Sequence, residues 1–235
     1  MKGDNNMRII FDENGAYMPS LANNAEKHGI AQYRFPHNYE FVGREFTVTT
    51  SLKEYTFKFT DKQFAEVNGE KCDYESEKLE KEMYFVRFGF KAVAFDLMNS
   101  QVVIFDNDDV IPGVIKGSGQ VMPSFTTDDM VETKVSWVFG CNRYITQEFI
   151  SNDTVRTSWA PRDEKKADNK YIAIKLRDTF YFVYATSGVL KNTCAPFFTQ
   201  RVVLLEDYER CMTAGCIMGK GFDPIMVAGY ARFED

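Results

Sequence analysis

The chain has 235 residues, of which 44% are hydrophobic and 15% aromatic, and its formal net charge at pH 7 is −6. This composition is too apolar for a disordered chain and is sufficient for one or two folded cores. The acidic balance argues against nucleic acid as a partner, because binding to phosphate backbones requires clustered Lys and Arg side chains.

The N-terminal part of the chain differs from the rest. The segment from Met1 to Arg8 is polar and is not followed by the apolar region of a secretion signal, so we expect a cytoplasmic protein. No run of the sequence approaches the roughly 18 apolar residues of a membrane span, and no membrane partner is expected. A short helix is predicted from the N-cap Ser20 to its stop at Gly29.

From Gly43 onward, hydrophobic and polar residues alternate, as in half-buried strands. The strands predicted in the first half are residues 46–49, 55–59, 83–90, 93–97 and 102–105. A loop rich in Asp, Gly and Pro is predicted from Asp106 to Pro123 and is the best domain boundary. The strands predicted after it are residues 134–139, 143–150, 155–159, 171–176, 180–186, 201–206, 215–219 and 226–233.

The two halves also resemble each other in sequence. The run Tyr84-Phe85-Val86 recurs as Tyr181-Phe182-Val183, an offset of 97 residues from position 84 to position 181. In the same order, residues 54–56 match residues 143–145, and Val93-Ala94-Phe95-Asp96 matches Val203-Leu204-Leu205-Glu206. Three matches in one order predict an internal duplication, although any two β-meanders share such runs.

Together these patterns predict an all-β fold of two tandem antiparallel β-barrels with a short N-terminal helical segment. The predicted boundaries are residues 1–42 for the N-terminal extension, 43–123 for the first barrel and 124–235 for the second. A barrel of about eight strands is wide enough to hold one small ligand at its centre.

The order of the motifs resembles that of the molybdenum cofactor biosynthesis protein F (MoaF) family. In the second half the motifs are Arg156–Trp159, Phe180–Val183, Gln200–Leu205 and Gly215–Gly219, and in the first half Gly43–Phe46, Met83–Val86 and Val102–Phe105. The resemblance covers the chain from residue 43 to the C-terminus. It implies two calycin-like (lipocalin-like) barrels and a MoaF-like protein that binds a small molecule.

A more distant resemblance is to the phenolic acid decarboxylases, which are single barrels of the same general kind. Those enzymes hold a phenolic acid between tyrosines, an arginine and a glutamate. The position of that glutamate corresponds to Thr186 here, and the equivalent strand of the first half, Val86–Phe90, also lacks a carboxylate. The resemblance therefore does not imply decarboxylation chemistry for this chain.

Candidate ligand-binding residues come mostly from the second half: Tyr144, Glu148, Arg156, Ser158, Trp159, Tyr171 and Tyr184, with Arg87 from the first half. Inside a barrel, an arginine would pair with a ligand carboxylate or phosphate, and the tyrosines and Trp159 would stack on an aromatic ligand. The alternatives are that Arg156 faces solvent or pairs with Glu148, that Arg87 lies on a solvated face, and that the aromatic residues pack in the core. Alternation shows which residues share a face but not which face points inward.

No cofactor and no metal site are predicted. The five cysteines are scattered without a CxxC pair, and only two histidines occur.

Three hypotheses for the function remain. The leading one is a protein that holds an aromatic or acidic metabolite inside a barrel, more readily the second. The alternative is a cofactor-independent enzyme (lyase, isomerase or cyclase) in the same barrel, with Tyr144 and Glu148 as its acid–base pair. The third is a pair of filled barrels used for homo-oligomerisation or protein binding.

Overall fold

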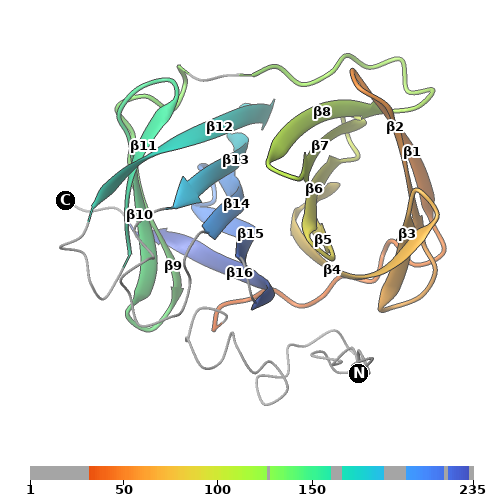
Figure 1. Ribbon diagram of the computed structural model, residues 1–235, viewed down its shortest axis with the longest axis horizontal. Coiled ribbons are helices and arrows are strands. Elements are labelled where there is room, and N and C mark those ends of the chain that lie inside the picture. The colour runs from red at the N-terminus through yellow and green to blue at the C-terminus, as the bar shows by residue number, and fades with distance from the viewer. Residues whose placement is uncertain (1–31, 126–127, 160–165, 188–199, 220–221, 233–235) are drawn as a thin grey trace.

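Two closed barrels, each of eight antiparallel strands, form the fold in a computed structural model (Figure 1). The structure describes residues 32–125, 128–159, 166–187, 200–219 and 222–232, and these contain strands but no helices. The all-β prediction with two barrels is thereby confirmed. The helix predicted at residues 20–29 lies outside the described residues. Within the described residues, no helix is long and apolar enough to cross a membrane.

The first barrel is an eight-stranded meander closed by pairing of its first and last strands. Its strands are β1 (Glu45–Thr50), β2 (Glu54–Phe59), β3 (Phe64–Val67), β4 (Glu70–Glu80), β5 (Met83–Phe88), β6 (Lys91–Asp96), β7 (Gln101–Asp106) and β8 (Asp109–Ile115).

The second barrel repeats this order and closes in the same way. Its strands are β9 (Lys134–Gly140), β10 (Arg143–Phe149), β11 (Thr154–Trp159), β12 (Ala167–Arg177), β13 (Phe180–Ser187), β14 (Gln200–Asp207), β15 (Met212–Gly219) and β16 (Phe222–Arg232).

Strand β8 occupies part of the segment predicted to be a loop. The prediction of a loop beginning at Asp106 was wrong there, because β8 pairs with β1 and closes the first barrel. Its Pro112 and Gly113 resemble turn signals in sequence. A Cβ on Gly113 would lie only 2.7 Å from Val48 Cγ1 and 3.0 Å from the Thr49 carbonyl oxygen, so glycine here permits close approach of two strands.

Strand β4 was missed because its sequence is strongly charged. Its Glu75 and Glu77 are buried and form ion pairs with the equally buried Arg34. Arg34 belongs to the segment that precedes β1, which also reaches the second barrel: the Tyr33 amide donates to the Phe139 carbonyl oxygen at 3.2 Å. Glu75 and Glu77 therefore hold this segment in place and do not face solvent, whereas Glu70 and Lys71 at the start of β4 are exposed.

Aromatic side chains fill the first barrel. Phe41, from the segment before β1, enters one end with its ring centroid 4.7 Å from Phe59, 4.6 Å from Tyr84 and 5.4 Å from Phe95. Phe57 joins the same buried cluster. The interior of this barrel is thus a packed hydrophobic core.

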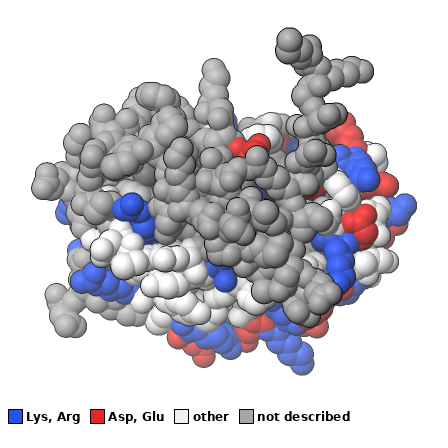
Figure 2. Space-filling view, turned by 90° about the horizontal axis from the view of Figure 1, so that it is seen from below, with Lys and Arg blue, Asp and Glu red and all other residues white. Residues whose placement is uncertain are grey.

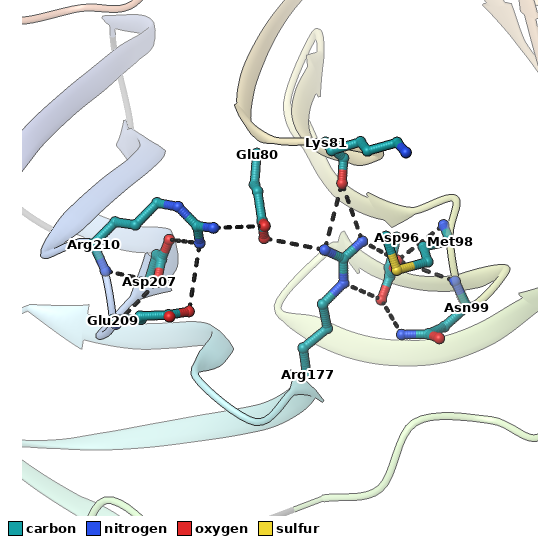
Figure 3. A network of polar contacts seen from close by, with 9 residues as sticks. All are labelled: Glu80, Lys81, Asp96, Met98, Asn99, Arg177, Asp207, Glu209 and Arg210. Atoms are coloured by element: carbon teal, nitrogen blue, oxygen red, sulfur yellow. Dashed lines mark hydrogen bonds and ion pairs between the residues drawn. The ribbon is translucent and has the colours of Figure 1, made fainter.

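The outer faces of the two barrels pack against each other. Phe85 lies 6.4 Å from Phe182, and further buried residues of β5–β7 and β12–β16 belong to the same cluster. Ion pairs border this contact: Arg177 binds Asp96 at 2.6 Å and Glu80 at 3.1 Å (Figure 3). Elsewhere, acidic and basic side chains are interspersed over the described part of the face that Figure 2 shows.

The barrels repeat individual contacts as well as topology. In each, a lysine and a tyrosine on neighbouring strands share a carboxylate from the segment before the first strand. The two sets are Lys78, Tyr84 and Glu40 in the first barrel and Lys175, Tyr181 and Asp129 in the second. Likewise, the Asp96 side chain accepts hydrogen bonds from the second and third amides after it, and so does Asp207. These repeated contacts support internal duplication and give a residue-by-residue match between the copies.

Candidate functional site

Four of the predicted site residues lie on the outer face of the second barrel. Their sequence neighbours on β10 and β11 belong to its hydrophobic core, so Tyr144, Glu148, Arg156 and Ser158 point the other way. Arg156 Nε donates to Asp168 Oδ1 at 2.8 Å, and its Nη1 lies 3.8 Å from Glu148. These four residues therefore do not line the interior, and the outward-facing alternative for Arg156 is the arrangement found.

Two further predicted residues lie between the barrels. Arg87 is buried and donates from Nη2 to Asp73 at 2.6 Å and to Glu75 at 2.7 Å. The Tyr184 hydroxyl donates to Asp108 Oδ1 at 2.9 Å. Both side chains satisfy carboxylates near the contact between the barrels and are not part of a barrel interior.

Trp159 and Tyr171 do line the interior of the second barrel. Trp159 lies 6.0 Å from the Phe139 ring, and the Tyr171 hydroxyl donates to the Ser151 carbonyl oxygen at 3.0 Å. Burial raises the pKa of Tyr171 to about 12, so it remains a neutral phenol at physiological pH. Of the predicted set, these two are placed to contact a ligand inside a barrel.

A polar cluster that the sequence patterns did not predict lies inside the second barrel. Its centre is Glu206 on β14, which shares a strand face with the core residues Val202 and Leu204. Strand register places Glu206 opposite Tyr181 on β13 and Thr213 on β15. The barrel therefore carries a carboxyl group on an otherwise apolar stretch of its inner face.

Hydrogen bonds fix one side of this cluster. The Tyr208 hydroxyl donates to Glu206 Oε2 at 2.8 Å, and Trp137 Nε1 donates to Gln147 Oε1 at 3.0 Å. The Tyr208 ring makes edge contacts with Trp137 and Tyr181, both at 5.7 Å between centroids. The cluster thus has a rigid aromatic wall.

The other side of the cluster is unsatisfied. Glu206 and Gln147 are fully buried, and neither Glu206 Oε1 nor Gln147 Nε2 has a hydrogen-bond partner among the described residues. Buried polar atoms are usually paired, and one left unpaired costs about 1–3 kcal/mol. Two such atoms in one barrel interior are a feature that a bound molecule would explain.

Burial also changes the ionisation of this carboxyl group. It raises the pKa of Glu206 to about 8, although the hydrogen bond from Tyr208 acts in the opposite direction. At pH 7 Glu206 is therefore mostly a neutral acid that can donate a hydrogen bond, and above pH 8 it becomes a carboxylate that can accept a proton. Perturbed groups of this kind concentrate at functional sites.

The first barrel shows that the fold does not require these polar groups. Phe95 pairs with Tyr84 and Val102 in the same way that Glu206 pairs with Tyr181 and Thr213. Repeated hydrogen bonds and strand registers extend the match to the other members of the cluster. The apolar residues Val48, Phe57, Phe95, Leu97 and Val102 stand where the second barrel has Trp137, Gln147, Glu206, Tyr208 and Thr213.

No group of three or more His, Cys, Asp or Glu side chains in the described part of the chain could hold a metal ion. No protein-family model matches the chain, and no curated protein matches it. The resemblance to the MoaF family therefore stays a prediction.

Proposed function

We propose that the second barrel binds a small, uncharged aromatic molecule whose acceptor oxygen is held by Glu206 and Gln147. The observation that carries this proposal is the pair of buried, unpartnered atoms, Glu206 Oε1 and Gln147 Nε2. At pH 7 the protonated carboxyl and the amide are both donors, so a carbonyl, ether or hydroxyl oxygen would satisfy them together.

Aromatic rings on the inner face support an aromatic ligand. The buried cluster of this barrel contains Trp137, Trp159, Tyr171 and Tyr181, and Tyr208 packs against it. Ring pairs contribute about 0.5–1.5 kcal/mol beyond the burial of their area. The aromatic part of the prediction is thus retained, together with the two-barrel architecture that the MoaF resemblance implies.

The charge of the inner face favours an uncharged ligand over an acidic one. Two basic residues among the described ones are in phase with this face: Arg143, the first residue of β10, and Lys175, which pairs with Asp129 at 2.8 Å and is partly exposed. Neither belongs to the buried cluster and no cation among the described residues acts on Glu206, so a ligand carboxylate held there would be an unpaired buried charge, which is strongly unfavourable.

Calorimetric titration with small aromatic probes tests the proposal. At pH 7 we expect acetophenone, an uncharged ketone, to bind and benzoate, an anion of similar size, to bind at least tenfold more weakly. The variant Glu206→Leu should weaken acetophenone binding about tenfold, the loss of roughly one hydrogen bond of 1.4 kcal/mol. Phe95→Leu, at the matched position of the first barrel, should leave the affinity unchanged.

Three results would overturn the proposal. They are tighter binding of benzoate than of acetophenone, equal affinity in wild type and Glu206→Leu, or no heat of binding with any uncharged aryl ketone. Tryptophan fluorescence gives a second readout, because the chain has two tryptophans and both Trp137 and Trp159 lie in the second barrel.

A further inference from the structure

The Glu206 carboxyl group has one oxygen fixed by a hydrogen bond and one oxygen without a partner, an arrangement suited to proton transfer. Tyr208 fixes Oε2 through a 2.8 Å hydrogen bond, whereas Oε1 is left without a partner on the inner face of the barrel. Gln147 is fixed through its own oxygen by Trp137, which leaves its amide nitrogen as the free end. One free carboxyl oxygen and one free N–H donor therefore belong to the same buried cluster.

We propose that Glu206 moves a proton between carbon and oxygen of a bound aryl ketone, which makes the second barrel a keto–enol tautomerase. This inference rests on the proposed binding of an uncharged aromatic ketone. It also gives the enzyme hypothesis an acid–base group inside the barrel, where Tyr144 and Glu148 are not.

The reaction needs no co-reactant. The Glu206 carboxylate removes a proton from the carbon next to the ketone carbonyl, and the C–H electron pair becomes a C=C bond. The carbonyl π pair moves onto its oxygen, where the Gln147 N–H stabilises the negative charge. Glu206 then returns the same proton to that oxygen, giving the enol and regenerating the carboxylate.

Tyr208 acts in this scheme as a positioning residue, and the first barrel helps to hold its turn. Asp207 Oδ1 accepts hydrogen bonds from the Glu209 and Arg210 amides at 3.0 and 3.2 Å. Arg210 Nη2 in turn donates to Glu80 of the first barrel at 2.7 Å (Figure 3). The turn that carries Tyr208 is thus held by Asp207 within the second barrel and by Glu80 of the first barrel.

The other ionisable groups around Glu206 do not titrate in the same pH range. Tyr208 and Tyr181 face it from the β14–β15 turn and from β13, and burial raises the pKa of each. They remain neutral phenols between pH 6 and pH 9. Because the base is the ionised form of Glu206, the rate should rise with pH and level off above about 8.

Proton NMR in D₂O tests this inference with acetophenone, an aryl ketone whose methyl C–H signal disappears as enolisation exchanges it for deuterium. We expect wild-type protein to accelerate the exchange. Glu206→Gln keeps the shape and a hydrogen-bond donor but cannot take up a proton, so the exchange rate should fall at least about 100-fold. Calorimetry should show that this variant still binds acetophenone.

A second variant separates chemistry from structure. Tyr208→Phe keeps the ring but removes the donor to Glu206, so the midpoint of the pH–rate profile should move to higher pH. Phe95→Leu should change neither rate nor midpoint. Binding without exchange in wild type, or equal exchange in Glu206→Gln, would overturn the tautomerase and leave the binding function standing. If no aryl ketone binds, both proposals fall.

Discussion

Replacing Glu206 by Gln is expected to make the protein more stable, by an amount that grows with pH. Burial raises the pKa of Glu206 in the folded chain to about 8, from an ordinary value of 4.5. Between these two pH values the folded chain holds a proton that the unfolded chain has released. The contribution of Glu206 to stability therefore falls as the pH rises from 4.5, and it levels off above 8, where both forms are ionised.

The size of the effect follows from the two pKa values. Each pH unit in this interval removes about 1.4 kcal/mol, so Glu206 costs about 3 kcal/mol at pH 7 and about 5 kcal/mol at pH 9. Glutamine has no proton to release. The free energies of unfolding of wild type and Glu206→Gln should therefore be similar at pH 4 and diverge by about 3 kcal/mol at pH 7.

Urea denaturation between pH 4 and pH 9, followed by tryptophan fluorescence, measures this difference. Both Trp137 and Trp159 report on the second barrel, which contains the substitution. Phe95→Leu is the matched control, since its difference from wild type should not vary between pH 5 and pH 9. A pH-independent difference for Glu206→Gln, or a variant less stable than wild type at pH 8, would refute the reasoning.

Three further substitutions test the fold. Arg177→Met should destabilise the chain by about 2–3 kcal/mol in urea, because it leaves the fully buried Asp96 carboxylate without its cation. Gly215→Ala should lower the melting temperature by several degrees or prevent folding, since its Cβ would lie 2.2 Å from the Val203 carbonyl oxygen. Phe95→Glu should abolish cooperative unfolding of the first barrel in circular dichroism, because a carboxylate would replace a ring packed among other rings.

Much of the fold follows from the period-two pattern, but the short strand β3 and the strands β4 and β8 were not predicted from it. For β4 and β8 the reason lies in their tertiary contacts. Strand β4 carries charges on the face that meets Arg34 and Arg87. From the sequence alone, such a charged segment is more simply interpreted as solvated or irregular. Strand β8 contains Pro112 and Gly113, which are turn signals unless a neighbouring strand comes close. Both depend on contacts with residues far away in the sequence, which local patterning does not contain.

The site was missed for a related reason. The sequence match placed Asp96 opposite Glu206, but the two turn hydrogen bonds made by each side chain align Asp96 with Asp207. A shift of one residue along a strand moves a side chain to the opposite face. Glu206 therefore corresponds to the interior Phe95, and the signal that could have found it was a lone carboxylate in phase with Val202 and Leu204.

A shift of one residue in the match between the halves also affects the predicted acid–base pair, Tyr144 and Glu148. The sequence match placed Tyr55 opposite Tyr144, whereas the backbone hydrogen bonds that tie Phe59 and Phe149 to the segments before β1 and β9 align Tyr55 with Ile145. Alternation correctly grouped Tyr144 with Glu148 but could not decide which face is inside. Which face points inward is decided by the closure of the barrel.

Because the chain contains two copies of the same barrel, a position in one barrel can be compared with the matched position in the other. At one interior position the first barrel has Phe95 in a packed aromatic core, so a barrel of this fold forms without a carboxyl group at that position. The second barrel has Glu206 there, at a cost of about 3 kcal/mol at pH 7, and leaves one oxygen of it unpaired. Destabilising groups of this kind are characteristic of sites where activity requires them. The difference between the copies therefore supports the proposal that the small molecule binds in the second barrel.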